Sequence, residues 1–444
     1  MGGDALRSLE LLESNSVDSI VTDPPYGLSK EPDAAEVLRH WLAGEDYVHG
    51  GGGFMGKGWD SFVPGPSVWR ECLRVLKPGG FLLAFGGTRT VDLLTIAVRL
   101  GGFEVRDLLQ WLYGTGFPKS MDVAKAIDKQ ASGKVGAWRG GGAGDDPKPA
   151  WELAVGDVDP WNGKVITGIK PGHEGHVGRD NMKALREGTM SGDGGFTRPW
   201  MLDDYAVASS HFTHQLSPEA AEWGGWGTAL KPANEPIVMA RKPLSESTVA
   251  ANVQRWGTGA LNIDAGRIPV EGQEVAGRWP SNVMLSHHPS CAEDGQTCHP
   301  GCPIAALDRQ AGARSSGKPG VRGAGGAVNT SAAYGAESRK EGDPMTGYGD
   351  SGSASRFFYC PKPSKKERGE GNTHPTVKPV ALMEYLVGLT TRPGGTVLDP
   401  FCGSGTTLVA AANLGMSGIG LDENDEYLNI ARRRLDAATR GADS

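Results

Sequence analysis

The chain has 444 residues, of which 38% are hydrophobic, so it is long enough for about two to three folded domains. Its net charge of -7 argues against a protein that coats nucleic acid, but it leaves room for a local basic groove. No run approaches the ~18 apolar residues of a membrane span. Six scattered cysteines, and a start without a basic segment before an apolar core, predict a cytoplasmic protein.

Strands and helices alternate over the first quarter of the chain. Short apolar runs bounded by glycine or proline read as buried strands, and longer runs with helical spacing lie between them. The predicted order is strand 17–23, helix 66–78, strand 79–87, helix 88–102 and strand 103–113. This alternation predicts an α/β fold built on a parallel sheet.

The middle of the chain loses this pattern, and the C-terminal part regains it. Residues 131–228 and 311–356 are rich in loop-forming residues, and "EPIVMAR" at 235–241 reads as a single strand between them. Regular alternation then returns as helix 377–390, strand 395–400, helix 406–415, strand 417–422 and helix 424–438.

A glycine turn follows the first of these C-terminal strands, in "VLDPFCGSGTT" at 397–407. Gly403 and Gly405 let the backbone approach a ligand closely, and the next helix begins beside them. The following strand ends in Asp422, whose carboxylate can accept both hydroxyls of a ribose. A third glycine and a Walker lysine are both missing, which argues against a dinucleotide loop and a P-loop. A purely structural turn remains the alternative.

Three longer motifs identify a protein family more specifically than the two glycines do. "TDPPYG" at 22–27, "DPFCGSGTT" at 399–407 and "GIGLDENDEY" at 418–427 resemble motifs of the β group of amino-methylating DNA methyltransferases. "NTHPTVKPVALMEYLV" at 372–387 resembles the segment that leads into the cofactor loop of that group. The resemblance implies a Rossmann-like sheet that is circularly permuted, because the catalytic motif comes first and the cofactor loop last.

The resemblance also implies roles for individual residues. The catalytic motif is Asp23, Pro24, Pro25 and Tyr26. S-adenosylmethionine is the implied cofactor, and Asp422 would hold its ribose while Asp4 would contact its adenine ring. The other implied cofactor residues are Thr376 and Lys378 at the methionine end, and Asp399, Phe401, Gly403 and Gly405 in the loop.

The composition of the catalytic motif suits methylation of an exocyclic amine. The lone pair of such an amine is delocalised into the base, and the base must be flipped out of the duplex to be reached. Tyr26 offers an aromatic face for the flipped base, and Asp23 offers a carboxylate that accepts hydrogen bonds from the amine. The two prolines fix the backbone, which makes the Pro24 carbonyl a rigid second acceptor. A capped strand followed by a proline turn is the alternative interpretation.

Adenine N6 is favoured over cytosine N4 as the target. In the group that the chain resembles, the cytosine enzymes more often have serine at the position of Asp23. "FMGKGWDSF" at 54–62 also resembles a segment of adenine-specific relatives. N4-cytosine methylation remains the alternative, followed by a catalytically inactive DNA-binding relic. An NAD-dependent oxidoreductase is disfavoured by the missing third glycine.

The resemblance divides the chain into three parts. Residues 1–130 would form the catalytic half of the methyltransferase domain, and 371–444 the cofactor-binding half. Residues 131–370 would be an inserted target-recognition region, except that 229–245 supply a strand of the catalytic sheet. Double-stranded DNA is the expected partner. A homodimer and a cognate restriction enzyme are known in this group, and the sequence leaves both open.

Two basic stretches are candidate DNA contacts. The first runs from Arg356 to Lys378, with four further cations at Lys362, Lys365, Lys366 and Arg368. The second contains Arg241, Lys242, Arg255 and Arg267. Solvated charge runs are the alternative interpretation of both.

A loop at 287–302, "HHPSCAEDGQTCHPGC", gathers three cysteines and three histidines. His288, Cys291, Cys298 and Cys302 could complete a tetrahedral zinc site of a structural kind. The spacing is not that of paired C-x-x-C knuckles, so partly buried free thiols are an equal alternative.

Overall fold

The structure is a computed structural model of the whole chain, and its described part falls into two compact units. One unit contains Met1–Gly116 and Ala233–Ser444, and the other contains Phe117–Pro232. The described residues are 3–28, 32–50, 60–114, 116, 120–131, 168–169, 211–212, 218–270, 277–292, 297–318, 320–321, 342, 344–345, 347–361, 372–374 and 376–442.

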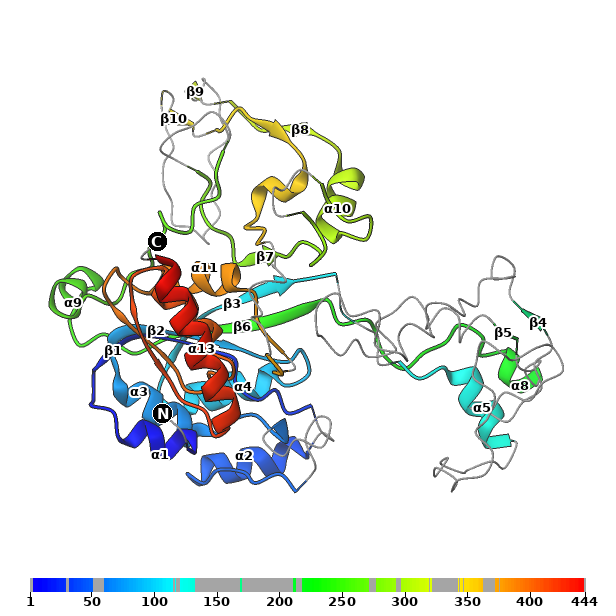
Figure 1. Ribbon diagram of the computed structural model, residues 1–444, viewed down its shortest axis with the longest axis horizontal. Coiled ribbons are helices and arrows are strands. Elements are labelled where there is room, and N and C mark those ends of the chain that lie inside the picture. Colours follow the sequence, from blue (N-terminus) through cyan, green and yellow to red (C-terminus); the bar gives the residue numbers. More distant parts are fainter. Residues whose placement is uncertain are drawn as a thin grey trace. The chain divides into compact units, whose positions relative to one another are not determined.

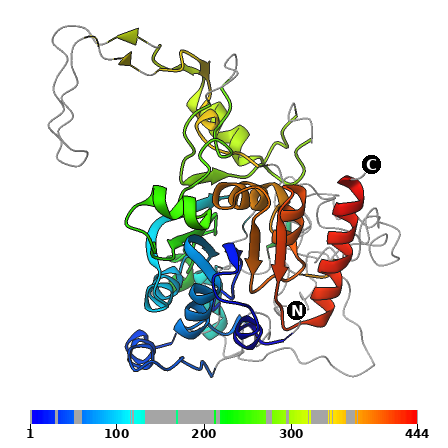
Figure 2. The same ribbon diagram turned by 90° about the vertical axis from the view of Figure 1, so that its left-hand side faces the viewer.

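A seven-stranded sheet forms the centre of the larger unit (Figure 1). The strands lie in the order β13-β12-β1-β2-β6-β3-β7, and only β6 runs antiparallel to its neighbours. Their bounds are β1 Val17–Thr22, β2 Leu76–Phe85, β3 Glu104–Leu112, β6 Asn234–Arg241, β7 Val283–Leu285, β12 Thr396–Asp399 and β13 Ser417–Gly420. The C-terminal strands β12 and β13 thus lie beside the N-terminal β1 (Figure 2). This is the mostly parallel, permuted sheet that the sequence predicts.

Side chains alternate between two apolar cores because successive residues of a strand point to opposite faces. Ile20 of β1 belongs to the core that also contains Trp69, whereas its neighbour Val21 belongs to the core with Leu382. Helices therefore cover both faces of the sheet, α3 Pro66–Val75 and α4 Val91–Leu100 on the first and α11 Val380–Thr390 and α12 Thr406–Asn413 on the second. The result is a three-layer α/β/α domain with one apolar core on each face of β1 and β2.

Other helices and short strands complete the described part. In the larger unit they are α1 Ala5–Glu10, α2 Ala34–Leu42, α9 Val249–Trp256, α10 Pro303–Ala311, the 3₁₀ helix η6 Ala354–Phe357 and α13 Asp425–Ala442, with the two-residue pairs β8 Arg314–Ser315 with β11 Ser351–Gly352 and β9 Gly320–Val321 with β10 Pro344–Met345. The smaller unit contains α5 Val123–Ala131, α8 Pro218–Ala221 and the pair β4 Gly168–Ile169 with β5 His211–Phe212. None of the described helices is both long and apolar enough to cross a membrane.

Two expectations about the elements need correction. The predicted helix 66–78 ends at Val75, and β2 begins already at Leu76. Pro78 disfavours helical backbone at the residue before it, so the chain is extended before the glycines. The sheet also gains β7, a three-residue strand that sequence reasoning missed.

Candidate active site

The carboxyl ends of β1 and β12 bring the N-terminal and C-terminal motifs together. β1 ends at Thr22, directly before the Asp23-Pro24-Pro25-Tyr26 motif, and β12 ends at Asp399, directly before the glycine loop. The two strands are parallel neighbours, so both motifs emerge at the same edge of the sheet. The Thr22 hydroxyl donates to the Asp399 carboxylate at 2.7 Å, which ties the two ends directly.

Lys378 and Glu235 meet Asp23 and Tyr26 of the catalytic motif. Lys378 Nζ lies 2.7 Å from Asp23 Oδ2 and 3.1 Å from Glu235 Oε2. The Tyr26 hydroxyl lies 2.7 Å from Asp23 Oδ1 and 2.8 Å from Glu235 Oε2. A phenol carries a single proton and can donate to one carboxylate at a time, whereas the ammonium has three protons for its three oxygen neighbours. Lys378 is therefore the group that satisfies both carboxylates at once.

The surroundings raise the pKa of both Lys378 and Tyr26. Burial alone would lower the pKa of Lys378, but the carboxylates of Asp23 and Glu235 outweigh it, so the pKa is raised. Burial and the same two carboxylates raise the pKa of Tyr26 well above its usual value. At neutral pH Lys378 is therefore an ammonium and Tyr26 a neutral phenol. The Asp23 and Glu235 side chains are 22% and 19% exposed and Lys378 only 9%, so a substrate reaches the carboxylates more easily.

Sequence reasoning missed Glu235 and Asp60. Glu235 follows the first residue of β6, the single strand predicted in the middle of the chain, but nothing in that segment marked it as functional. The buried Asp60 accepts hydrogen bonds from the backbone N–H groups of Tyr26 at 2.8 Å and Gly27 at 3.2 Å. It thereby holds the turn of the catalytic motif. Its neighbours 54–59 in the predicted adenine-type segment lie outside the described residues.

The glycine loop has the backbone conformation that its residues predict. Gly403 and Gly405 have φ of +49° and +79°, a region that other residues rarely adopt. A side chain at Gly405 would come within 2.7 Å of Ala431 Cβ, so helix α13 also requires glycine there. The Asp422 carboxylate accepts from the N–H of Gly403 at 2.9 Å and has further lone pairs for a ligand.

The remaining predicted cofactor residues lie around this loop. The N–H of Gly3 donates to the backbone carbonyl of Asp422, which brings the adjacent Asp4 to the loop, where its carboxylate caps α1 by accepting from Arg7. Phe401 is half-buried, and its N–H donates to Asp399. Their roles toward a cofactor stay predictions.

Residues 372–374 and 376–378 contact both motifs, through His374 at Gly403 and Lys378 at Asp23. The backbone carbonyl oxygen of Thr376 lies 2.9 Å from His374 Nδ1. The His374 ring packs against Tyr427 and lies close to Gly403, and burial lowers its pKa. Lys378 contacts Asp23 and Tyr26 of the catalytic motif, and its predicted role at the methionine end of the cofactor stays a prediction.

Asp399 is held by groups of the chain itself. Thr22, Thr407 and the N–H of Phe401 all donate to its carboxylate. Burial raises the pKa of Asp399 to about 6, although these hydrogen bonds oppose the rise.

The Asp399→Asn variant is expected to remove one component of the pH dependence of stability. Because the folded pKa lies above the unfolded value of about 3.9, the folded state binds the proton more tightly, and the free energy of unfolding falls as pH rises from about 4 to about 6. The contribution amounts to about 3 kcal/mol. Urea unfolding of both proteins at several pH values measures it. A stability difference that does not vary with pH would contradict this assignment.

The metal-ligand prediction needs one correction. The structure groups His287, not His288, with Cys291, Cys298 and Cys302. The ring of His288 instead stacks on His299, with centroids 4.1 Å apart. The spacing of the residues could not separate two adjacent histidines, whose side chains leave the backbone in different directions.

Several of the predicted phosphate contacts are engaged within the protein. Lys378 belongs to the catalytic cluster, and the Arg356 guanidinium donates to backbone carbonyls of Gly352 and Ser353. The four cations of the second stretch are also paired internally: Arg241 with Glu104, Lys242 with Asn15, Arg255 with Glu246 and Arg267 with Asp264. Lys362, Lys365, Lys366 and Arg368 lie outside the described residues.

Parts of the chain are similar to known DNA methyltransferases. The chain is 49% identical over 74 residues to the type II methyltransferase M2.DpnII of Streptococcus pneumoniae, covering 17% of this chain and 28% of that protein. It is 44% identical over 70 residues to the DNA adenine methyltransferase YhdJ of Escherichia coli K12, covering 16% and 24%. The matches thus span about a quarter of the length of these relatives. A crystal structure of an M1.HpyAVI–SAM complex aligns over 98% of this chain and 97% of that one, at a TM-score of 0.35 and 14% identity.

The family assignment depends on a broader match. The sequence profile of a DNA methylase family of N6 and N4 methyltransferases matches residues 17–129 and 228–433. These two ranges include the catalytic motif, Glu235, the glycine loop and Asp422, and together they exceed half of the chain. The protein therefore belongs to the family of N6/N4 DNA methylases.

Proposed function

We propose that the protein is a site-specific DNA methyltransferase that transfers a methyl group from S-adenosylmethionine to N6 of an adenine flipped out of double-stranded DNA. One observation carries the proposal: Thr22 and Asp399 join the catalytic motif and the glycine loop at one edge of the sheet. A methyl donor held by the loop would therefore lie beside the carboxylates that receive the amine. Membership of the N6/N4 family supports the same reaction class.

The loop residues suit S-adenosylmethionine. Gly403 and Gly405 give the loop its left-handed backbone turns, and Asp422, two residues after β13, offers a half-buried carboxylate for the ribose hydroxyls. When bound, S-adenosylmethionine supplies an electrophilic methyl group on a sulfonium. Asp4 and Phe401 flank the loop and would contact the adenine ring and the methionine part.

The catalytic cluster would act on the base by binding and orienting its amine. The Asp23 carboxylate and the Pro24 carbonyl accept hydrogen bonds from the amine, which localises its lone pair on nitrogen and provides an acceptor for the departing proton. Tyr26 offers its ring to the face of the base. Asp60 fixes this turn through the N–H groups of Tyr26 and Gly27, so the acceptors need little reorganisation.

Adenine is favoured over cytosine by Asp23 and by the similarity to YhdJ, a protein named as an adenine methyltransferase. N4-cytosine methylation is the alternative. The test is expression in a bacterial host without DNA methylation, followed by mass spectrometry of the digested DNA and modification-sensitive sequencing. N6-methyladenine at one short motif, absent with an Asp23→Ala copy, is the expected result. N4-methylcytosine alone would overturn the base assignment, and no modified base would favour an inactive relic.

A further inference from the structure

Three cysteines and a histidine meet in the segment between β7 and α10. Cys291, Cys298 and Cys302 pack into a small apolar cluster with Leu285 of β7 and Ile304 of α10. All three are free thiols, and His287 supplies a ring nitrogen to the same group. We propose that His287, Cys291, Cys298 and Cys302 bind one structural Zn²⁺ ion. The proposal is independent of the methyl-transfer reaction.

The distances match a tetrahedral zinc site. His287 Nδ1 lies 3.6 Å from Cys298 Sγ and 3.5 Å from Cys302 Sγ. With Zn–S of about 2.3 Å and Zn–N of about 2.0–2.1 Å, tetrahedral angles place sulfur and nitrogen about 3.6 Å apart. The four ligand atoms all lie within 4.8 Å of one another. Binding of an ion at their centre would thus require only small movements of the four side chains.

Neighbouring N–H groups are placed to stabilise thiolates. The N–H of His299 donates to Cys291 Sγ at 3.3 Å, the kind of outer contact that supports a metal-bound sulfur. Cys302 is the N-cap residue of α10, so its sulfur lies at the positive end of a nine-residue helix. Four protein ligands leave no open position for a water or a substrate, which marks the centre as structural.

The centre would fix the sheet edge to the segment that follows it. His287 comes two residues after β7, whose Leu285 donates its N–H to the Tyr359 carbonyl at 2.9 Å. On the other side, Cys302 is the N-cap of α10, and Asp308 of that helix accepts from the N–H and the hydroxyl of Ser355 at 3.0 and 2.8 Å. Zinc would therefore lock β7, α10 and residues 355–359 into one assembly.

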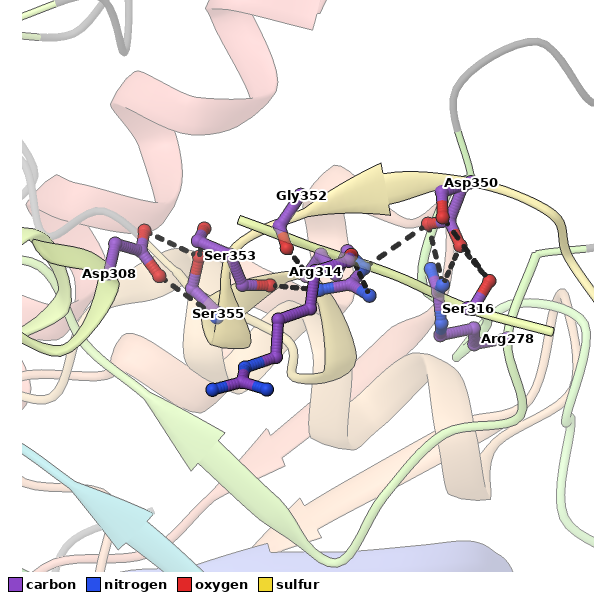
Figure 3. A network of polar contacts seen from close by, with 9 residues as sticks. Arg278, Asp308, Arg314, Ser316, Asp350, Gly352, Ser353 and Ser355 are labelled. Carbon is purple, nitrogen blue, oxygen red and sulfur yellow. Dashed lines mark hydrogen bonds and ion pairs between the residues drawn. The ribbon is translucent and has the colours of Figure 1, made fainter. Parts of the chain in front are cut away.

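This assembly carries a network of charged side chains (Figure 3). Ser355 lies next to Arg356, and Arg356 and Arg278 both pair with Asp350 at 3.4 and 2.6 Å. Figure 3 shows Asp308 and Ser355 at one end of the network and Asp350 with Arg278 at the other. Loss of the metal would thus loosen a region well beyond the four ligands.

Metal analysis of purified protein tests the proposal with closely matched variants. Protein from zinc-supplemented medium should contain one zinc per chain by plasma mass spectrometry. His287→Gln and Cys298→Ser should each lose most of it. The controls are His288→Gln, which changes the adjacent histidine, and Cys360→Ser, which changes a cysteine of the same apolar cluster. Both controls should keep the metal.

Cobalt substitution gives a second readout that is independent of activity. Tetrahedral thiolate ligation should give intense visible bands and a sulfur-to-cobalt charge-transfer band, and Cys298→Ser should weaken both. Limited proteolysis within 286–303 should accelerate after chelation in the wild type. Far less than one zinc per chain, or equal zinc in His287→Gln and His288→Gln, would overturn the proposal.

Discussion

Replacing Asp23 by asparagine is expected to reduce the rate of methyl transfer by about 10³-fold. The asparagine side chain keeps the size of the carboxylate and one acceptor oxygen, but it has no negative charge to stabilise the amine as nitrogen becomes positive. Lys378 retains Glu235 as a partner, so the buried ammonium still has a counter-charge. The rate is measured as transfer of tritium from labelled S-adenosylmethionine to DNA under single-turnover conditions.

Cofactor binding separates this effect from misfolding. Calorimetry should give the same affinity for S-adenosylmethionine in the wild type and in Asp23→Asn, because the glycine loop is untouched. Asp107→Asn removes an exposed carboxylate from β3 and serves as the control, with an unchanged rate. An Asp23→Asn variant with nearly full activity would remove this residue from the catalytic role.

Most of the sheet could be predicted because each of these strands is marked by a short local pattern in the sequence. β1, β2, β3, β6, β12 and β13 each contain a short apolar run bounded by glycine, proline or charge, and the motif order implied that the C-terminal strands join β1. β7 was missed because three residues are too few to show a period, and its pairing with β3 comes from chain positions far apart in sequence.

The site was predicted only as far as its motifs reach. Asp23 and Asp422 belong to recognisable sequence motifs, whereas Glu235 and Asp60 act through contacts that form only when distant segments meet. Their partner Tyr26 is separated from them by 209 and 34 residues. The choice between His287 and His288 failed for the same reason, since it depends on side-chain direction rather than on spacing.

Replacing Lys378 by methionine is expected to shift the acidic limb of the pH–rate profile upward by about one to two pH units. The substitution removes the ammonium that lies within 2.7 and 3.1 Å of Asp23 and Glu235. Two carboxylates would then share the single proton of Tyr26, and their mutual repulsion raises the pKa of the pair. A proton bound there blocks the acceptor of the amine, so the rate falls on the acid side of neutrality and recovers as the pH rises.

A second substitution tests whether charge is the cause. In the double variant Lys378→Met with Glu235→Gln, Asp23 is the single remaining carboxylate, and the acidic limb should move back toward its wild-type position. Lys318→Met, at an exposed lysine, is the control that should leave the profile unchanged. If the profile of Lys378→Met coincides with that of the wild type, the ion pair does not persist in the reacting enzyme. If the double variant fails to restore it, Lys378 acts by packing among the rings of Tyr26, Phe85 and Trp111 rather than by charge.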